Sequence, residues 1–518
     1  MRRQARRAVL RGPTGPLPPS RLRLPCLAAD GFASRRDFSN RLLDQTMGFK
    51  LSTLQILPAV FLAGALYSCG VEQSQPNVLL ITLDTTRADH LSCYGYGKQT
   101  TPRIDAIAAE GVRFDAALST AGITPMSHAS ILTGLNPYRH NLRVFWGNAG
   151  HRLPADVPSL PEILAARGYD TGAFVSAYPV SAAYGLDRGF ATFDTGLDES
   201  LAELDLSQQQ KHDSHWFDGP RSSTQRRGDQ TTDAALAWLD QRGKEPWCAW
   251  LHYFDVHDFS IVPPAAFAAR HGITYDPTIS PRDPDAREAL YDPELNFIDT
   301  QLGRVFDALK ASGQDENTII VITADHGQGL KDGKARHGWI KHRLLYQWCL
   351  RVPLILRIPG QAPGVVKNQV RSIDILPTLL EALDLAPPAP VEGASLLALA
   401  RGETEDTPRL AYADALNLVD THSPKRGLPE HCIDNLFCVS DGRWKLIHHG
   451  QHPENSELFD LQNDPLELRN LAASEPQVVA RLRTFLTTTG AMEIRAEEAG
   501  EEDADSAARL RGLGYVGD

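Results

Sequence analysis

Three short runs of apolar, often β-branched residues are prominent along the chain, at residues 77–83, 247–254 and 318–323. Each run is largely apolar throughout and therefore predicts a strand buried on both faces, as in a parallel sheet. An aspartate follows each run directly or one residue later: Asp84, Asp255 and Asp325. Ligands bind outside the carboxyl ends of the strands in such sheets, so the pattern predicts a site there.

The segments around these runs predict an alternation of strands and helices. We expect further strands at residues 168–177 and 352–358, which gives an α/β fold with a doubly wound, mostly parallel sheet. Residues 438–447 and 457–461 predict strands of a small antiparallel sheet, hence a smaller C-terminal α+β subdomain. Helices are predicted at residues 102–110, 125–133, 229–242, 293–311, 373–383 and 476–487.

The helix at residues 125–133 begins beside a threonine. Pro125 is the favoured first helical residue and Gly134 follows the last turn, so Thr124 is predicted as the N-cap. Capping alone would explain this threonine. A helix N-terminus also attracts anions, however, and a hydroxyl there would face a bound anion.

The amino terminus differs from the rest of the chain. Residues 1–46 are rich in Arg, Pro and Leu without periodicity, and we interpret them as a disordered or wrongly included extension. Residues 47–69 have the pattern of a signal peptide. The segment ends in Leu-Tyr-Ser-Cys, which resembles a lipobox with Cys69 as the lipidated residue; an ordinary signal peptide is the alternative. Both predict an exported protein.

Composition limits the function classes. The net charge of −12 includes a basic first segment, so the remaining chain is acidic, which argues against a nucleic-acid-binding protein. Residues 491–518 predict an acidic, solvated tail. Of the seven cysteines, Cys432 and Cys438 are close together in a polar region and are interpreted either as a disulfide or as two free thiols.

Carboxylates gathered at one sheet edge repel one another unless a cation neutralises them. Asp325 and His326 stand on a loop that also contains His337 and His342, a mixture of oxygen and imidazole ligands that suits zinc. Two ions about 4 Å apart would form the usual clamp for displacement at a phosphoryl group. We predict one ion held by Asp84, Thr124, Asp325 and His326, and a second held by Asp255, His257 and His337.

Several motifs, in order, resemble those of the sulfatase family within the alkaline phosphatase superfamily. They are NVLLITLDTTRADHLSCYGYG (77–97), SHASILTG (127–134), HYFDVH (252–257), ITADHG (322–327), LRVPLIL (350–356) and ELFDLQNDPLELRNL (457–471). The resemblance implies an alkaline-phosphatase-like catalytic domain at residues 75–400 and a C-terminal subdomain at residues 401–490. It also implies metal ligation by Asp84, Asp325 and His326, with calcium possible at Asp84 instead of zinc, and Thr124 as the nucleophile.

The nucleophile position departs from the sulfatase pattern. Sulfatases carry Cys or Ser there, which is oxidised to formylglycine, and an Arg four residues later; this chain has Thr124 and His128. Threonine cannot form that aldehyde because its β-carbon bears a methyl group. Thr85 also replaces the second Asp of the usual calcium pair. The set resembles that of phosphodiesterases and phosphoethanolamine transferases of the superfamily, which use Thr with zinc or manganese.

The expected function is therefore that of an exported metal-dependent hydrolase of anionic esters. Thr124 is predicted to attack, phosphoester being favoured over sulfate ester, while His128 and His342 are candidate proton donors to the leaving group. A sulfatase acting without formylglycine and an inactive binding protein of the same fold are the alternatives. The expected partner is a small-molecule, glycan or lipid ester, and the predicted membrane contact is through Cys69.

Overall fold

The computed structural model describes residues 75–145, 149–197, 224–257, 261–274, 276, 283–419, 428–495 and 509. The predicted extension, the signal segment with Cys69 and most of the acidic tail lie outside these residues. Within the described part of the chain, no helix is both long and apolar enough to cross a bilayer.

An eight-stranded, mostly parallel sheet forms the centre of the protein, with the strand order β4-β3-β5-β1-β6-β7-β2-β8. Strand β7 is the exception, because it pairs antiparallel with both β6 and β2. The central position of β1 between β5 and β6 places the ends of the three apolar runs side by side. The strands are β1 (Asn77–Leu83), β2 (Val112–Leu118), β3 (Asp170–Val175), β4 (Thr192–Asp194), β5 (Trp247–Tyr253), β6 (Thr318–Thr323), β7 (Arg351–Arg357) and β8 (Gly364–Arg371).

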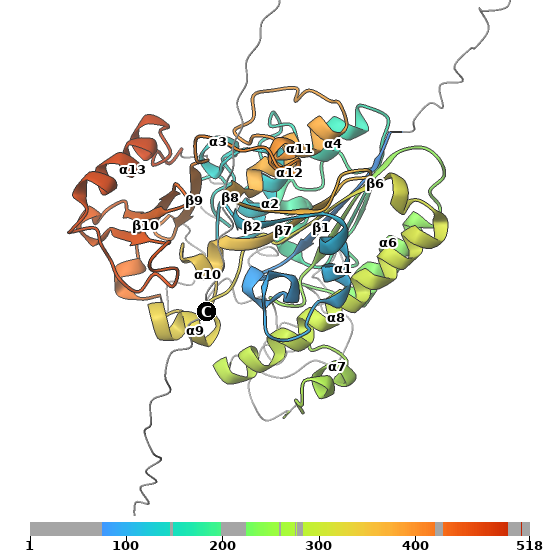
Figure 1. Cartoon of the computed structure of the whole chain (residues 1–518), viewed down its shortest axis with the longest axis horizontal. Coiled ribbons are helices and arrows are strands. Elements are labelled where there is room, and N and C mark those ends of the chain that lie inside the picture. The colour runs from blue at the N-terminus through green and yellow to red at the C-terminus, as the bar shows by residue number, and fades with distance from the viewer. Residues whose placement is uncertain are drawn as a thin grey trace, which may run out of the picture. The chain divides into compact units, whose positions relative to one another are not determined.

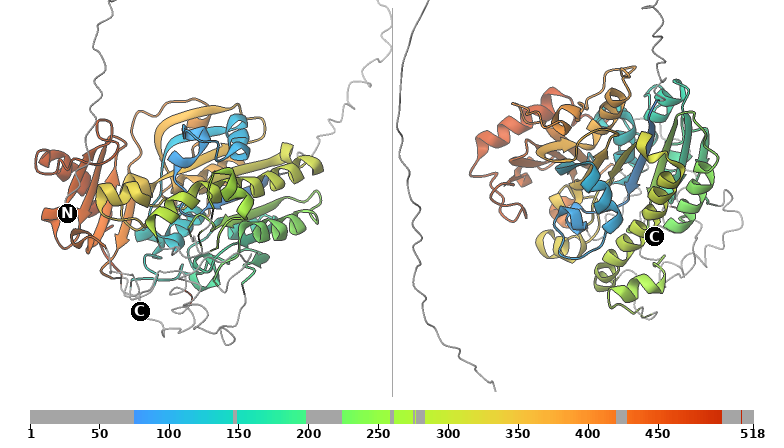
Figure 2. Two further views of the ribbon diagram at one scale, coloured as in Figure 1. Left: turned by 90° about the horizontal axis from the view of Figure 1, so that it is seen from below. Right: turned by 45° about the vertical axis from the view of Figure 1, so that its right-hand side comes forward.

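Helices cover both faces of this sheet, which explains why its strands are apolar throughout (Figures 1 and 2). Leu79, Ile81 and Leu83 of β1 join a core with α1, α6 and α8, whereas Val78 and Leu80 join the core on the other face, with α2 and α11. The helices are α1 (Pro102–Glu110), α2 (Thr124–Thr133), α3 (Pro137–His140), α4 (Leu160–Ala165), α6 (Gly228–Leu239), α7 (Ala265–Arg270), α8 (Pro284–Ser312), α9 (Leu330–His337), α10 (Gln347–Leu350), α11 (Ile375–Ala382), α12 (Leu397–Ala400) and α13 (Pro476–Thr488).

A second, four-stranded antiparallel sheet of order β12-β11-β10-β9 forms the C-terminal part, as predicted. Helix α13 packs on β10 and β11 (Figure 1). Cys432 and Cys438 are both buried free thiols, so the unpaired alternative is the one observed. The strands are β9 (Ala411–Leu416), β10 (Asn435–Ser440), β11 (Trp444–His449) and β12 (Glu457–Asp460).

Some predicted boundaries were wrong. Helix α8 begins at Pro284, with Asp283 as its N-cap, so the predicted start at Pro293 lies inside the helix. Helix α9 was missed, because its sequence LKDGKARH has almost no apolar face. Thr124 is the first residue of α2 and Ile123 is the N-cap, so Thr124 does not cap the helix. Its hydroxyl therefore needs a different explanation.

Candidate active site

Asp84 and Asp325 meet at the carboxyl ends of β1 and β6. Thr82 of β1 is in register with Thr323 of β6, and each strand ends within two residues of its aspartate. Asp84, Asp325 and His326 are fully buried, and each offers a ligand atom within 4.8 Å of the others; no other such group occurs in the described residues. The predicted first cluster is thus assembled by the neighbouring positions of two strands.

The two carboxylates lack full compensation within the protein. Asp325 Oδ1 accepts the N–H groups of Thr85 at 3.0 Å and His326 at 2.7 Å. Asp84 Oδ1 and Asp325 Oδ2 are buried and have no hydrogen-bond partner among the residues described. Burial raises the pKa of both carboxyls well above the usual range, and for Asp325 the charge of Asp84 adds to this effect. A buried oxygen of this kind is costly unless something binds it.

Thr124 lies at the edge of this group. Its Oγ1 is 3.4 Å from His326 Nε2, and its hydroxyl also bonds to Asp84, which opposes the rise in the pKa of that carboxyl. The side chain is fully buried at the first turn of α2. The helix dipole of α2 favours a negative charge near this hydroxyl.

The backbone is strained directly beside the cluster. Thr85 has a φ of +49°, which is unfavourable for a β-branched residue. Its N–H bonds to Asp325 and its carbonyl oxygen accepts the Tyr291 hydroxyl at 2.7 Å, so both neighbours hold the conformation. Strain of this kind is concentrated at functional sites, where surrounding contacts maintain it.

Two histidines present unprotonated Nε2 atoms to the site. His326 Nδ1 is 3.1 Å from the Gly327 carbonyl and His342 Nδ1 is 2.8 Å from the Gly122 carbonyl; carbonyls only accept, so Nδ1 carries the proton in both rings. Each Nε2 then carries a lone pair when the ring is neutral. His342 Nε2 lies 3.2 Å from His257 Nε2. A backbone-bonded Nδ1 with an open Nε2 is the usual arrangement of a metal-binding histidine.

His252 belongs to the site but was not predicted. Its Nδ1 accepts the Ser176 N–H at 3.3 Å, so its proton is on Nε2, which lies 3.3 Å from Asp84 Oδ2. His252 therefore donates to a carboxylate of the cluster and orients it. In the sequence this histidine stands inside an apolar strand and looks like a core residue. The available signal was its position near the carboxyl end of a central strand, β5.

His128 and His342, the two predicted proton donors, both make hydrogen bonds within the protein. His128 Nδ1 donates to the Thr124 carbonyl at 2.8 Å and Nε2 lies 3.0 Å from the Thr82 hydroxyl, so both nitrogens are engaged below the site. His342 has its proton on Nδ1, away from the site. Burial lowers the pKa of both rings well below the ordinary value, which keeps them neutral.

The predicted second cluster is not assembled as expected. His337 ends α9, where Nε2 donates to the Glu467 carbonyl and Nδ1 accepts from Trp348, so neither nitrogen is open to a metal. Asp255 Oδ1 accepts the N–H of Gly228 at the start of α6, and burial raises the pKa of its carboxyl to about 7. Of the three predicted ligands, only His257 approaches a site residue, and its neighbour is His342.

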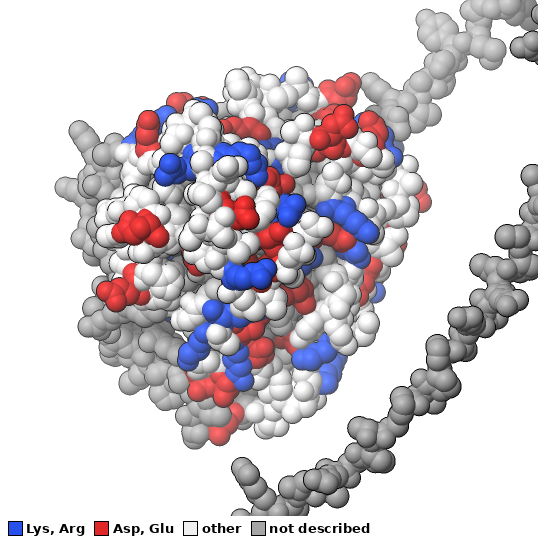
Figure 3. Space-filling model, turned by 60° about the vertical axis from the view of Figure 1, so that its left-hand side comes forward, with Lys and Arg blue, Asp and Glu red and all other residues white. Residues whose placement is uncertain are grey.

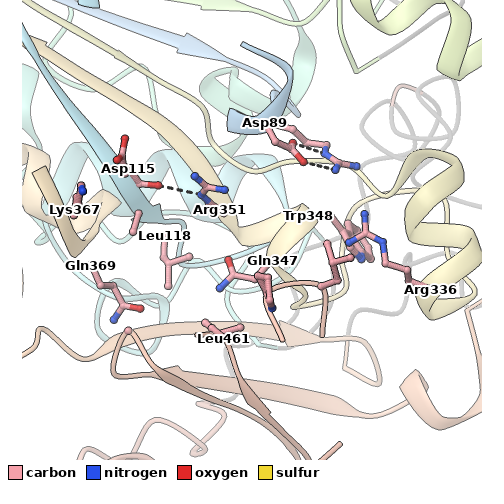
Figure 4. A pocket seen from close by; sticks show the side chains of 15 residues that line it. Asp89, Asp115, Leu118, Arg336, Gln347, Trp348, Arg351, Lys367, Gln369 and Leu461 are labelled. Atoms are coloured by element: carbon pink, nitrogen blue, oxygen red, sulfur yellow. Dashed lines mark hydrogen bonds and ion pairs between the residues drawn. The ribbon is translucent and has the colours of Figure 1, made fainter. Parts of the chain in front are cut away.

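A cavity of about 370 Å³ is lined by other residues than those of the cluster. Arg87 and Trp348 line the cavity and also pack against Gly327, directly after His326. Figure 4 shows Arg351 between Asp115 and Asp89 on its wall. Positive and negative side chains alternate over the face drawn in Figure 3, which shows no extended basic surface. Arg87 and Trp348 thus support the loop of His326 from the wall of a cavity that the cluster residues do not line.

Comparison with known proteins agrees with this geometry. Residues 76–385 match the Sulfatase family, and residues 335–490 match the region described as N-sulphoglucosamine sulphohydrolase, C-terminal. The chain therefore belongs to the sulfatase family, a family of ester hydrolases that generally depend on a divalent metal.

Relatives match along most of their length. An N-acetylglucosamine-6-O-sulfatase of Bacteroides thetaiotaomicron is 24% identical over 511 residues, covering 81% of this chain and 87% of the relative. The multifunctional alkaline phosphatase superfamily protein PehA of Trinickia caryophylli is 26% identical, covering 80% and 94%. The crystal structure of the phosphonate monoester hydrolase of Agrobacterium radiobacter has a TM-score of 0.61 at 24% identity, covering 81% and 96%, and so shares the fold.

Proposed function

We propose that this protein hydrolyses an anionic ester with Thr124 as the nucleophile, and that phosphate or phosphonate esters are preferred over sulfate esters. The observation that carries the proposal is the position of the Thr124 hydroxyl, 3.4 Å from His326 Nε2 and bonded to Asp84. Because threonine cannot become formylglycine, we assign the attack to its own oxygen.

The cluster fits a divalent cation. Two buried carboxylate oxygens that accept no hydrogen bond from the described residues, together with Nε2 of His326, form a mixed oxygen and nitrogen donor set. We propose that Asp84, Asp325, His326 and the Thr124 oxygen hold this ion, zinc being favoured over calcium because an imidazole is present. When bound, such an ion lowers the pKa of a hydroxyl and stabilises developing negative charge.

A second ion is proposed with a changed ligand set. The Nε2 atoms of His257 and His342 lie 3.2 Å apart, where His257 donates to His342, and an ion bound by both rings would replace this hydrogen bond once the His257 proton is on Nδ1. His342 thus takes the place predicted for His337. Asp255 lies on the same strand end as His257, but its carboxylate bonds to Gly228 in this structure.

The remaining residues orient the reacting groups. Asp84 accepts the hydrogen bond of the Thr124 hydroxyl and so fixes the direction of its lone pairs, while His252 holds Asp84 from the opposite side. The positive end of the α2 dipole at Thr124 favours an anion there. The complete burial of Thr124, Asp84 and Asp325 keeps the site in a low dielectric, which strengthens each of these interactions.

Four para-nitrophenyl esters distinguish the candidate functions: the phosphate monoester, the phosphate diester, the phenylphosphonate and the sulfate. They are compared after the purified protein is treated with chelator and reloaded with zinc, manganese or calcium. We expect metal-dependent turnover that is fastest with a phosphorus ester. Sulfate turnover dominating would instead establish a sulfatase acting without formylglycine, which the sulfatases among the relatives favour. No turnover with any ester would favour the inactive binding protein.

Export and anchoring are part of the proposal and rest on the sequence of residues 47–69. We expect wild-type protein expressed in a bacterial host to be recovered from the envelope and to incorporate labelled palmitate. Cys69→Ser should abolish the label while leaving the protein exported. Label that persists in this variant would contradict anchoring at Cys69.

A further inference from the structure

Residues 466–468 of the C-terminal subdomain reverse the usual distribution of apolar and charged side chains. Leu466 is 49% exposed and Leu468 is 62% exposed, whereas Glu467 between them is 2% exposed. The Asp464 carboxylate accepts the N–H groups of Leu468 and Arg469, and Glu467 has a φ of +57°. A turn that exposes two leucines in order to bury a charged residue indicates a specific use of that residue.

Every acceptor of Glu467 is engaged. Its Oε1 is 2.7 Å from Nζ of Lys445, which is fully buried on β11. Its Oε2 accepts the N–H of Gln347 at 2.6 Å, and its carbonyl oxygen accepts Nε2–H of His337 at 3.0 Å. We call His337, Gln347, Lys445 and Glu467 the Glu467 cluster.

The Glu467 cluster fixes both ends of the segment that carries His342. His337 is the last residue of α9 and Gln347 is the first residue of α10, so residues 338–346 begin and end beside the same glutamate. The rings of His337 and Tyr346 stack at 3.7 Å, which brings the two ends together. Within the segment, the carbonyl of His342 accepts Nε1–H of Trp339 at 2.6 Å.

We propose that Glu467, held by Lys445, is a positioning residue that sets the distance between His342 and His257. This inference rests on the proposed function, because it assigns a role to the His257–His342 pair. A buried ion pair contributes little net stability compared with apolar side chains, so its retention needs another reason. The reason here is geometric: Glu467 holds one end of the His342 segment through its carboxylate and the other through its main-chain carbonyl. A shift of about 1 Å at a reacting group can reduce turnover about a hundredfold.

Two double variants separate positioning from simple stabilisation. Lys445→Met/Glu467→Gln removes both charges but retains an amide oxygen for the Gln347 N–H, whereas Lys445→Met/Glu467→Met also removes that acceptor. With the fastest of the four para-nitrophenyl esters, we expect the glutamine variant to stay within about threefold of wild-type kcat. The methionine variant should lose about tenfold or more in kcat with KM little changed. Equal kcat values in two equally folded variants would overturn the proposal.

Hydrogen exchange supplies a readout that does not depend on activity. The methionine double variant should exchange faster at residues 338–346, while the glutamine variant should not. The matched control is Asp434→Asn, because Asp434 is 1% exposed in the same subdomain and bonds to N–H groups outside this segment. We expect it to leave exchange at residues 338–346 and kcat unchanged. Unchanged exchange in the methionine variant would overturn the positioning role of Glu467, whether or not the wild type hydrolyses an ester. Absence of ester hydrolysis by the wild type would overturn only the proposed function.

Discussion

The carboxylates of Asp84, Asp325 and Glu467 are all buried, yet they differ in what compensates their charge. The Glu467 carboxylate accepts hydrogen bonds from Lys445 and from the Gln347 N–H, and its main-chain carbonyl accepts from His337, so the cluster is closed within the protein. Asp84 and Asp325 lie side by side, and each keeps one oxygen that accepts no hydrogen bond from the described residues. We call Asp84, Asp325 and His326 the open group and the Glu467 cluster the closed group. The comparison indicates that the open group binds a ligand and that the closed group holds a segment of the chain in place.

The comparison is tested most strongly at Thr124, which joins the open group. We expect Thr124→Ala to reduce turnover by about a thousandfold or more, because the attacking oxygen is lost, while metal content and fold are retained. Thr124→Ser should keep part of the activity. The matched control is Thr133→Ala, which removes a buried hydroxyl from the opposite end of the same helix. Steady-state kinetics decide, and an active Thr124→Ala enzyme would refute the nucleophile assignment.

The closed group is tested by removing one partner. Lys445→Met should cost about 3–5 kcal/mol of unfolding free energy at neutral pH, because Glu467 would be left buried without its counter-ion. Denaturant unfolding measures the loss. Adding Glu467→Gln should restore most of it, since the remaining amide carries no charge; a double variant as unstable as Lys445→Met would show that the charge is not the cause.

In the open group, removal of a charge should increase the free energy of unfolding, whereas in the closed group it decreases it. Asp325→Asn retains the oxygen that accepts the N–H groups of Thr85 and His326 but removes a charge next to Asp84. We expect the chelator-treated variant to be more stable than chelator-treated wild type by about 1–3 kcal/mol, since burial and Asp84 already disfavour the ionised form. Zinc should then stabilise wild type and not the variant. Calorimetry with and without zinc measures both effects, and a destabilised metal-free variant would contradict the open-group interpretation.

The sequence predicted the open group well because strand ends are easily recognised. Continuous apolar runs predicted β1, β5 and β6 nearly to the residue, and their adjacency brought Asp84 and Asp325 together. The edge strand β8, with polar residues at several positions, was missed because its GVVKNQVR pattern resembles a loop. A continuous apolar run reports burial of a strand on both faces, and edge strands lack that signal.

Side-chain direction was harder to predict than strand position. His337 and His342 are five positions apart on one segment, but α9 turns the first toward Glu467 and the following residues carry the second to Gly122. His252 looked like a core residue although it contacts Asp84. The Glu467 cluster could not be predicted, because it joins residues more than 100 positions apart through an unusual turn.

The smallest expected effect concerns His140, a closed counterpart of the open His326. Its Nε2 donates to the Ser130 hydroxyl at 3.0 Å and its Nδ1 accepts the Leu142 N–H at 3.1 Å, so the neutral ring is fully bonded. Burial, with the positive charge of Arg143 adding to it, lowers the pKa of His140 from 6.5 to about 3. Because the unfolded chain then binds a proton that the folded chain does not, stability is lost as pH falls below about 6.5. The loss at pH 5.5 is about 1.4 kcal/mol from this residue.

His140→Gln tests this linkage, because glutamine offers one donor and one acceptor but does not titrate in this range. We expect the difference in unfolding free energy between pH 7.5 and pH 5.5 to be smaller in the variant than in wild type by about 1.4 kcal/mol. Denaturant titrations at the two pH values measure it. A pH dependence identical to that of wild type would mean that His140 is protonated in the folded protein, which would require the Leu142 N–H to lose its acceptor. His140 would then be accessible to a ligand or to water. Its ring would not be fully hydrogen-bonded within the protein, and His140 would no longer differ from His326 in this respect.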